Sequence, residues 1–198
     1  MTDEKRPYRM KKRSELQEAT RLRITESAME LHGTLGPSRT SMSAVAEHAG
    51  VRRSTLYRYF ADEAQLFAAC SSHWNQQHPL PDIRAWATIH DPQERLKSGL
   101  LELYAYYAGA ENMLTNVFRD LDSMIVVKEQ FAPFADYMDA LHETLLAGHR
   151  TRGRRASRVR AAIGHAIAFT TWRSLVREQR LTPAEAVEMM CELTFTVT

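Results

Sequence analysis

Cysteine is scarce in this sequence, and its placement argues against two common ways of stabilising a small fold. The only two cysteines, Cys70 and Cys191, are far apart, and neither stands in a CxxC or Cys/His ligand spacing. Neither a disulfide framework nor a zinc site is therefore indicated, and such cysteines are typical of a reducing compartment. We expect no bound metal and a cytoplasmic location.

Long apolar runs are also missing. No stretch approaches the roughly 20 residues that span a membrane, and the start, MTDEKRPYRMKKR, lacks the apolar core of a signal peptide. Strand patterns, in which apolar and polar residues alternate between hairpin turns, are scarce as well. We expect no membrane partner and a chain built from helices.

Catalytic motifs are a third absence. The sequence contains no glycine-rich phosphate loop, no HExxH and no GxSxG, and single Ser, His and Asp residues are too common to define a catalytic triad. We predict that the protein is not an enzyme and uses no cofactor.

Positive charge is present and unevenly placed. The 198 residues carry a net charge of only +2, with 44% hydrophobic and 25% charged side chains, as in an ordinary globular protein. The first 60 residues nevertheless hold 12 Lys and Arg against 7 Asp and Glu. The excess positive charge is therefore N-terminal.

Apolar residues recur at helical spacing along the whole chain. A helix from about residue 14 to 33 is predicted by one apolar stripe, formed by Ile24, Ala28, Leu31 and Leu35. The segments DPQE at 91–94 and TPAE at 182–185 each combine an N-cap residue, a first-position proline and a capping-box glutamate. The pattern predicts an all-α fold of about nine helices.

Two prolines interrupt the helical pattern in HPLPDIRAWATIHD, residues 78–91. Proline disfavours a continuous helix, so a connection between domains is expected here. We place the boundary near residues 75–90, which gives an N-terminal domain of residues 1–75 and a C-terminal domain of residues 76–198.

Residues 41–49 and 52–60, joined by a turn at Gly50, have the proportions of a helix-turn-helix, whose second helix enters the major groove of DNA. Arginine bonds guanine or phosphate, and Ser, Thr and Tyr hydroxyls reach bases or the backbone. We predict base contacts from Arg53, Ser54 and Thr55. Contacts nearer the backbone or the groove edge are predicted for Ser41, Ser43, Arg52, Tyr57 and Tyr59.

Arg52 is unusual for its place, because it occupies the N-cap position of the predicted second helix. Ser or Asp would satisfy the free N–H groups there, whereas a cation opposes the helix dipole. A nearby phosphate would remove that conflict.

The segment TSMSAVAEHAGVRRSTLYRYFADEAQLFAA resembles the DNA-binding segment of TetR-family transcriptional regulators. The matching positions share one joint spacing and are Thr40, Ser41, Ala46, Glu47, Ala49, Gly50, Val51, Leu56, Tyr57, Phe60 and Leu66. The resemblance implies an all-helical homodimer with a small N-terminal helix-turn-helix domain and a larger C-terminal domain for effector binding and dimerisation. It also implies that double-stranded DNA and a small-molecule effector are partners, and that the protein acts as a repressor.

Three positions depart from the family pattern, which commonly has Ser at Arg52, His at Tyr59 and Lys at Glu63. Glu63 would remove a positive contact to the DNA backbone. The basic arm, formed by Arg9, Lys11, Lys12 and Arg13, could compensate along phosphates or in a minor groove. The alternative is a helical small-molecule-binding or scaffold protein with weakened DNA binding.

The C-terminal half contains an aromatic and methionine-rich set of residues. We expect an apolar effector cavity lined by Tyr104, Tyr107, Phe118, Met138, Phe169 and Trp172, with His165 as a polar contact. Helices at about 158–178 and 183–197 are expected to pair with their copies about a two-fold axis. The fourth helix, from about Asp62, is the expected lever between the two domains. The arginine-rich segment 150–160 is read as an interhelical loop, with a second site for an acidic partner left open.

Overall fold

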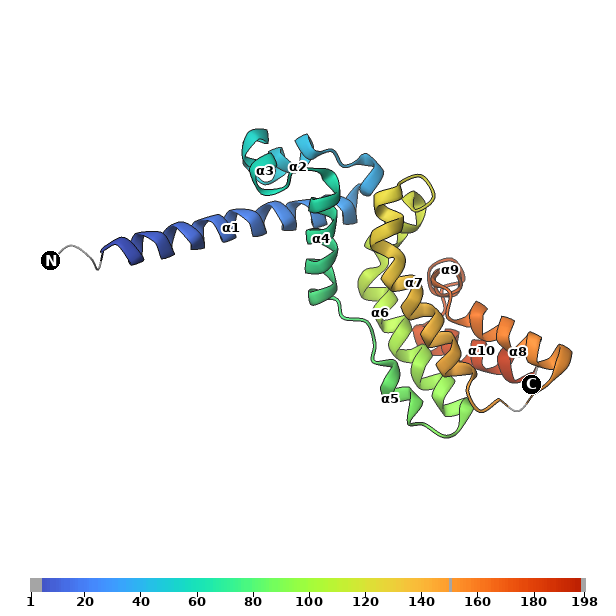
Figure 1. Ribbon diagram of the computed structural model, residues 1–198. Coiled ribbons are helices and arrows are strands. Elements are labelled where there is room, and N and C mark those ends of the chain that lie inside the picture. Colours follow the sequence, from blue (N-terminus) through green and yellow to red (C-terminus); the bar gives the residue numbers. More distant parts are fainter. Residues whose placement is uncertain (1–4, 150, 197–198) are drawn as a thin grey trace. The chain divides into compact units, whose positions relative to one another are not determined.

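The structure, a computed structural model, describes residues 5–149 and 151–196, with the side chains described from residue 10 onward. Arg150 and the side chain of Arg9 thus lie outside the described residues. Every regular element in the described ranges is helical, which confirms the all-α prediction (Figure 1). The elements are α1 (Lys5–Thr34), η1 (Pro37–Arg39), α2 (Met42–His48), α3 (Arg53–Tyr59), α4 (Glu63–Gln77), α5 (Ile83–Ala87), α6 (Pro92–Asp120), α7 (Ile125–Leu146), α8 (Gly153–Ala166), α9 (Phe169–Arg173), η2 (Ser174–Glu178) and α10 (Pro183–Thr196).

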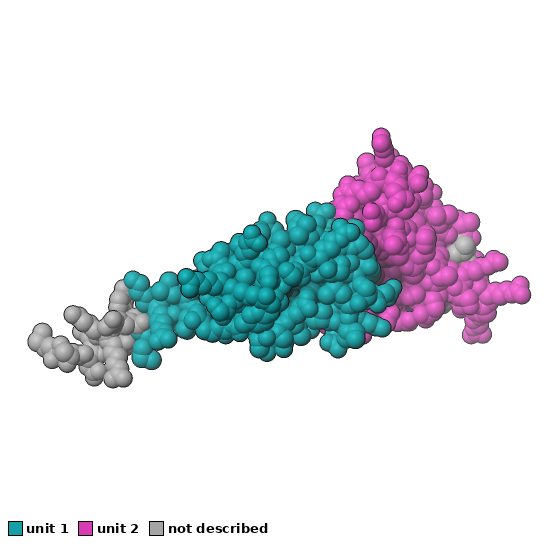
Figure 2. All heavy atoms as spheres, turned by 90° about the horizontal axis from the view of Figure 1, so that it is seen from above, with its two compact units in different colours: residues 1–77, 112–130 teal, residues 78–111, 131–198 magenta. Residues whose placement is uncertain are grey.

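The chain forms two compact units, which are coloured separately in Figure 2. Unit 1 contains the residues up to Gln77 together with Asn112–Gln130, and unit 2 contains His78–Glu111 and the residues from Phe131 onward. Residues 112–130 therefore pack with the N-terminal helices, although they follow the sequence boundary by more than 30 residues. A boundary at a single point in the sequence does not describe this interleaved division.

Unit 1 is held together by an apolar core between α1, α2, α3 and α4. The buried side chains at its centre are Ile24, Ala28, Val45, Ala46, Ala49, Leu56, Phe60, Leu66 and Cys70. Ile24 and Ala28 lie one turn apart on α1, as the sequence stripe predicts, and both are completely buried. The same stripe ends in the half-buried Leu31 and the exposed Leu35, where α1 runs out.

Unit 2 has a larger core of leucine and aromatic side chains from α5, α6, α7 and the C-terminal helices. Its buried guanidinium, Arg95, donates hydrogen bonds to the carbonyls of Ile89, Thr144 and Ala147. The predicted capping box of α10 is present, since Glu185 accepts a hydrogen bond of 2.8 Å from the Thr182 backbone N–H. Among the described residues, no helix is both long enough and apolar enough to cross a membrane.

Residues 153–160 form the first turns of α8, so the interpretation of the arginine-rich segment as an interhelical loop is wrong for them. The helix expected over residues 158–178 is not continuous. α8 ends at Ala166, α9 starts at Phe169, and a π-helical segment, η2, follows at Ser174–Glu178. The break leaves carbonyl groups without helical partners, and two buried tyrosines satisfy them. Tyr104 donates to the Ala166 carbonyl at 2.9 Å and Tyr107 to the Ile167 carbonyl at 2.6 Å. The sequence pattern missed the break because its stabilising partners lie about 60 residues away.

Candidate nucleic-acid interface

The start of α2 and the turn into α3 are defined by local sequence. The Ser41 hydroxyl caps α2 by accepting a hydrogen bond of 3.1 Å from the Ala44 N–H. Gly50 adopts a φ of 63°, in the left-handed region that favours glycine. The turn closes with a bond of 2.9 Å from the Val51 N–H to the Ala46 carbonyl. These contacts confirm the predicted helix-turn-helix and orient α3.

The inner face of α3 is anchored in the unit 1 core. Leu56 and Phe60 are 0% and 1% exposed, and both pack in the cluster that contains Ile24 and Leu66. Burial of these two side chains turns the opposite face of α3 outward. That exposed face contains Arg52, Arg53, Ser54, Tyr57 and Arg58, whereas Thr55 and Tyr59 are half-buried.

Two arginines on α3 are supported by neighbouring tyrosine rings. Arg53 donates a hydrogen bond of 3.3 Å to the Tyr57 hydroxyl, and its guanidinium lies 5.5 Å from the centre of the Tyr57 ring. Arg58 lies at 5.3 Å over Tyr59 in the same manner. Such cation–π contacts restrict a flexible side chain while leaving N–H donors available. Arg53 is thus partly ordered for contact with an acceptor.

The N-terminus of α3 is strongly electropositive. Arg52 is the N-cap residue, its side chain makes no capping hydrogen bond, and the first turn of α3 contains no acidic residue. Free backbone N–H groups, the helix dipole and the guanidiniums of Arg52 and Arg53 therefore favour an anion at this end. Ser41 and Ser43 are also exposed, at the start of α2.

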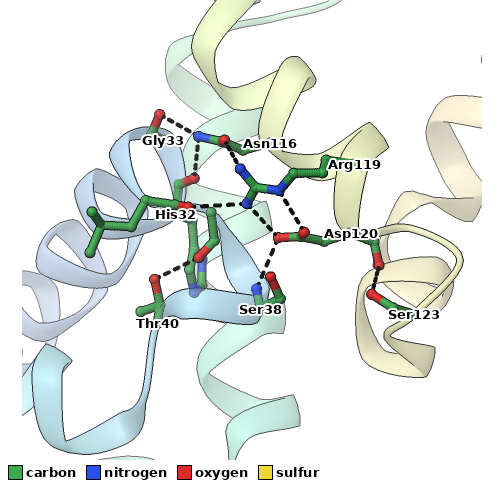
Figure 3. Close-up of polar contacts among 10 residues, drawn as sticks. His32, Gly33, Ser38, Thr40, Asn116, Arg119, Asp120 and Ser123 are labelled. Atoms are coloured by element: carbon green, nitrogen blue, oxygen red, sulfur yellow. Dashed lines mark hydrogen bonds and ion pairs between the residues drawn. The ribbon is translucent and has the colours of Figure 1, made fainter.

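A polar cluster, which we call the anchor cluster, joins the end of α6 to the end of α1 within unit 1, and two of its three side chains are buried. It consists of Asn116, Arg119 and Asp120 (Figure 3). Asn116 donates to the Gly33 carbonyl at 2.8 Å, and Arg119 donates to the Leu35 carbonyl at 3.0 Å. The last turns of α6 are therefore tied to the helix that supports α2 and α3.

Asp120 is the charge at the centre of the anchor cluster and is 3% exposed. Hydrogen bonds from Arg119, with a further one from the Ser38 backbone N–H at 2.9 Å, lower the pKa of Asp120 to about 2. Gly36, at a φ of 99°, lies so close that a Cβ there would collide with the Arg119 guanidinium. No sequence motif pointed to these residues. Their only signal was three polar residues at i, i+3 and i+4 in the last turns of α6.

His32 of α1 is buried against α4. Its ring stacks on Phe67 at 4.4 Å, and its Nδ1 lies 3.6 Å from the Cys70 Sγ. Burial lowers the pKa of His32 to about 4, and burial raises the pKa of the Cys70 thiol to about 12. Both groups are therefore neutral near pH 7, and this contact between α1 and α4 contains no charge.

Four of the seven residues predicted to bind an effector lie together in unit 2. They form an aromatic cluster, defined as Tyr104, Tyr107, Phe169 and Trp172, in which neighbouring ring centres lie 5.4–6.4 Å apart. Met138 is half-buried, with its sulfur 3.8 Å from the Tyr107 hydroxyl.

The remaining two lie elsewhere. His165 is exposed, and one of its ring nitrogens lies 3.2 Å from the Thr171 hydroxyl. Phe118 belongs to unit 1 and is 38% exposed. The structure thus brings together five of the seven predicted residues within unit 2, whereas Phe118 belongs to unit 1.

An exposed basic helix on a buried helical support defines a helix-turn-helix protein of the DNA-binding class. Residues 24–70 match the family model of bacterial regulatory proteins of the tetR family. This segment is a TetR-family DNA-binding domain, and the resemblance read from the sequence is confirmed.

One known protein is similar to part of this chain in sequence, and solved structures are similar to it in fold. The HTH-type transcriptional regulator SrpR of Pseudomonas putida is 30% identical over 100 residues, a match that spans 42% of this chain and 46% of that protein. NalD, the secondary repressor of the MexAB-OprM multidrug efflux pump in Pseudomonas aeruginosa, has a similar fold. Its TM-score is 0.59 at 22% identity, over 92% of this chain and 97% of NalD. The regulator FadR from Bacillus subtilis, in complex with stearoyl-CoA, has a TM-score of 0.61 at 17% identity, over 89% and 98% of the two chains.

Proposed function

We propose that the protein is a homodimeric transcriptional repressor that binds a roughly palindromic operator through α3 and leaves it when a small apolar or aromatic ligand binds unit 2. The observation that carries this proposal is the exposed, electropositive start of α3 on a buried support within a TetR-family domain. Because its operator would be chromosomal, such a regulator works in the cytoplasm, without catalysis and without a metal or cofactor.

The exposed side chains of α3 divide by position into two roles. Arg53, Ser54 and Thr55 occupy the first turn, the part of a recognition helix that reads base edges. Arg52, Tyr57 and Tyr59 are assigned to phosphates. Ser41 and Ser43 are assigned to the groove edge. The Ser41 oxygen accepts the capping bond, which leaves its O–H free to donate to a phosphate.

The basic stretch of α1 supports α3 in this proposal. Lys11, Lys12 and Arg13 are exposed on a helix. A helix is wider than the minor groove, at about 6 Å, so these cations suit phosphates on the rim of the site. The alternative, a protein with weakened DNA binding, was based on Glu63. This residue is the first of α4. A carboxylate there stabilises the helix dipole, which gives Glu63 a structural role that leaves DNA binding intact.

Operator binding is tested with DNA that flanks the protein's own coding region, in a gel-shift titration at fixed salt. The double variant Arg53→Ala/Tyr57→Ala should lose about 100-fold or more in affinity, since it removes one base contact and one phosphate contact. The control Arg84→Ala removes an exposed arginine of unit 2 that pairs with Asp82 and should bind normally. If the double variant bound with unchanged affinity, α3 would not be the helix that contacts the operator.

Dimerisation is assigned to the C-terminal helices. Met189 and Leu193 of α10 are 40% and 53% exposed and lie one turn apart, an apolar face that a second copy would cover. Trp172 is completely buried within its own chain, so a charge there would disrupt the fold rather than an interface. The variant Met189→Asp/Leu193→Asp should sediment as a 22.7 kDa monomer. Ile125→Asp, at a 77% exposed position in unit 1, is the control, and a dimer in both variants would contradict the assignment.

The change that releases the operator when a ligand binds is assigned to α4 and α6. α4 packs on α1, and the anchor cluster ties the end of α6 to the end of α1, so a displacement of either helix moves the support of α3. An effector would weaken operator binding by a coupling of about 1–3 kcal/mol, and operator DNA would weaken effector binding by the same factor. A bound ligand without this reciprocal effect would refute the switch while leaving DNA binding intact.

A further inference from the structure

Trp172 is the one residue of the aromatic cluster whose polar group has no partner. Its side chain is completely buried, yet its Nε1–H donates no hydrogen bond to any group in the described part of the chain. The hydroxyls of Tyr104 and Tyr107, in the same cluster, both donate to backbone carbonyls. Buried donors are almost always paired in folded proteins because an unpaired one loses its hydration without compensation.

The backbone around Trp172 is irregular on both sides. α9, which contains it, follows the break at Ile167–Ala168 and runs directly into the π-helical segment η2. Single π-helical turns are rare and occur frequently at functional sites. A segment with a helix break before it and a π turn after it has fewer regular hydrogen bonds to lose when it repacks.

One exposed ion pair covers the Trp172 ring. The Arg177 guanidinium of η2 lies 5.4 Å from the ring centre and donates to the Glu111 carboxylate of α6 at 2.6 Å and 2.9 Å. Arg177 is exposed, so water can replace its hydrogen bonds to Glu111 when this cover opens.

The surroundings of Trp172 select against a charged ligand. Tyr107 and Phe169 form apolar walls at 5.9 Å and 5.4 Å. Among the described residues of unit 2, the only buried ionised side chain is Arg95, and its donors are occupied by backbone carbonyls. The Arg177 charge over the ring is already paired with Glu111, so a buried charge on a ligand would have no unpaired partner here, whereas a neutral acceptor would meet the free indole N–H.

We propose that Trp172 is the specificity-determining hydrogen-bond donor of the effector site, and that the effector is an uncharged aromatic molecule with a carbonyl oxygen. This inference rests on the proposed function, in which unit 2 binds the effector. The ligand enters beneath Arg177, separates the packed rings of Phe169 and Trp172, and accepts a hydrogen bond from the indole nitrogen. The free form leaves this donor unpaired and the bound form pairs it, which gives the ligand its preference for the repacked state.

The probe is Prodan, an uncharged naphthyl ketone whose emission shifts to the red when its carbonyl accepts a hydrogen bond. Dimethylaminonaphthalene, which lacks the ketone, and the naphthoate anion serve as comparison probes. Wild-type protein should bind Prodan more tightly than either. Trp172→Phe should weaken Prodan binding about tenfold, the usual effect of one buried hydrogen bond, and leave dimethylaminonaphthalene within about twofold.

The matched control is Trp86→Phe. Trp86 is also buried in unit 2 and its Nε1 is likewise unpaired in the described chain, but it packs beside Gly99 on regular helices. This variant should bind both uncharged probes as the wild type does. Equal weakening of both by Trp172→Phe, tightest binding of the naphthoate, or no Prodan binding to wild type would each overturn the inference.

A second measurement needs no substitution in the site. In wild-type protein with isotope-labelled indoles, NMR should show the Trp172 N–H resonance moving downfield on addition of Prodan, while that of Trp86 stays in place. An unmoved Trp172 resonance with Prodan bound would overturn the inference. Operator release is measured separately: Prodan bound through Trp172 without any effect on DNA affinity supports the donor and contradicts the proposed switch.

Discussion

The two units each contain a cluster with buried polar groups, and the clusters differ in whether every polar group is hydrogen-bonded. In unit 1, each member of the anchor cluster has a hydrogen-bond partner, and the turns around it are closed by backbone bonds. In unit 2, a tryptophan donor in the middle of the aromatic cluster is unpaired, next to a broken helix and a π turn. A fully paired polar cluster specifies one geometry, whereas an unpaired group leaves a better-satisfied arrangement within reach. The anchor cluster thus favours a single geometry of unit 1, whereas the unpaired donor leaves unit 2 another arrangement to adopt.

Removal of Asp120 should give the largest loss of stability, because it breaks the fully paired cluster of unit 1. Asp120→Ala removes the acceptor of the Ser38 N–H and of two Arg119 donors, while Arg119 keeps the Asn116 and Leu35 oxygens. Because hydrogen bonds to a buried carboxylate are lost, we expect the free energy of unfolding to fall by about 3 kcal/mol. Urea unfolding followed by the fluorescence of Trp74, in a Trp86→Phe/Trp172→Phe background, measures unit 1 alone.

The control for Asp120 is Asp122→Ala, an exposed position in the same loop. It should change the stability by less than about 0.5 kcal/mol. Equal losses in both variants would mean that the anchor cluster has no special part in stabilising unit 1.

Acidification should weaken unit 1 through His32. The unfolded state binds a proton below the ordinary pKa of 6.5, whereas the folded state does so only near 4, so the unfolded state holds more protons between these values. Stability is therefore fully present above about pH 6.5 and falls with pH, by about 2–3 kcal/mol between about pH 7 and pH 4.5.

The measurement for His32 is urea unfolding across this pH range. His32→Phe keeps an aromatic ring against Phe67 and should remove the pH-dependent loss, whereas His90→Phe, at an exposed position, should retain it. The same slope in wild type and His32→Phe would assign the acid sensitivity to other groups.

The smallest loss of stability is expected for the unit 2 tyrosines that donate hydrogen bonds to backbone carbonyls. Tyr104→Phe leaves the Ala166 carbonyl at the helix break unpaired and should cost about 1 kcal/mol in urea unfolding. The same variant should bind Prodan at least as tightly as the wild type, because a weaker break repacks more easily. Tyr106→Phe, at the half-buried tyrosine directly before Tyr107, is the comparison. Weaker Prodan binding by Tyr104→Phe would mean that the hydrogen bond from Tyr104 to the Ala166 carbonyl must stay intact for the ligand to bind.

The recognition element was predictable from sequence because everything that forms it is local. The Ser41 cap, the left-handed Gly50 and the inward Leu56 and Phe60 lie within 20 residues of one another, and each obeys a helix-cap or helix-spacing rule. The outward position of Arg52 and Arg53 follows from the same spacing.

The residues predicted to line an effector cavity are brought together only in part. Helical spacing identifies which aromatic side chains are apolar and inward, but it does not say which of them meet. Phe118 shares a helix with Tyr104 and Tyr107 and yet belongs to the other unit.

The sequence by itself determined the helices, their caps and the exposed basic face of α3, because these depend on residues a few positions apart. Tertiary structure alone decided that residues 112–130 join unit 1, that the helix breaks after Ala166 and that the Trp172 donor is unpaired. Each of these depends on partners far away in the chain, such as Asn116 with Gly33 and Tyr104 with Ala166. A hydrogen bond between distant residues is satisfied only once the chain has brought them together, and no local pattern records that.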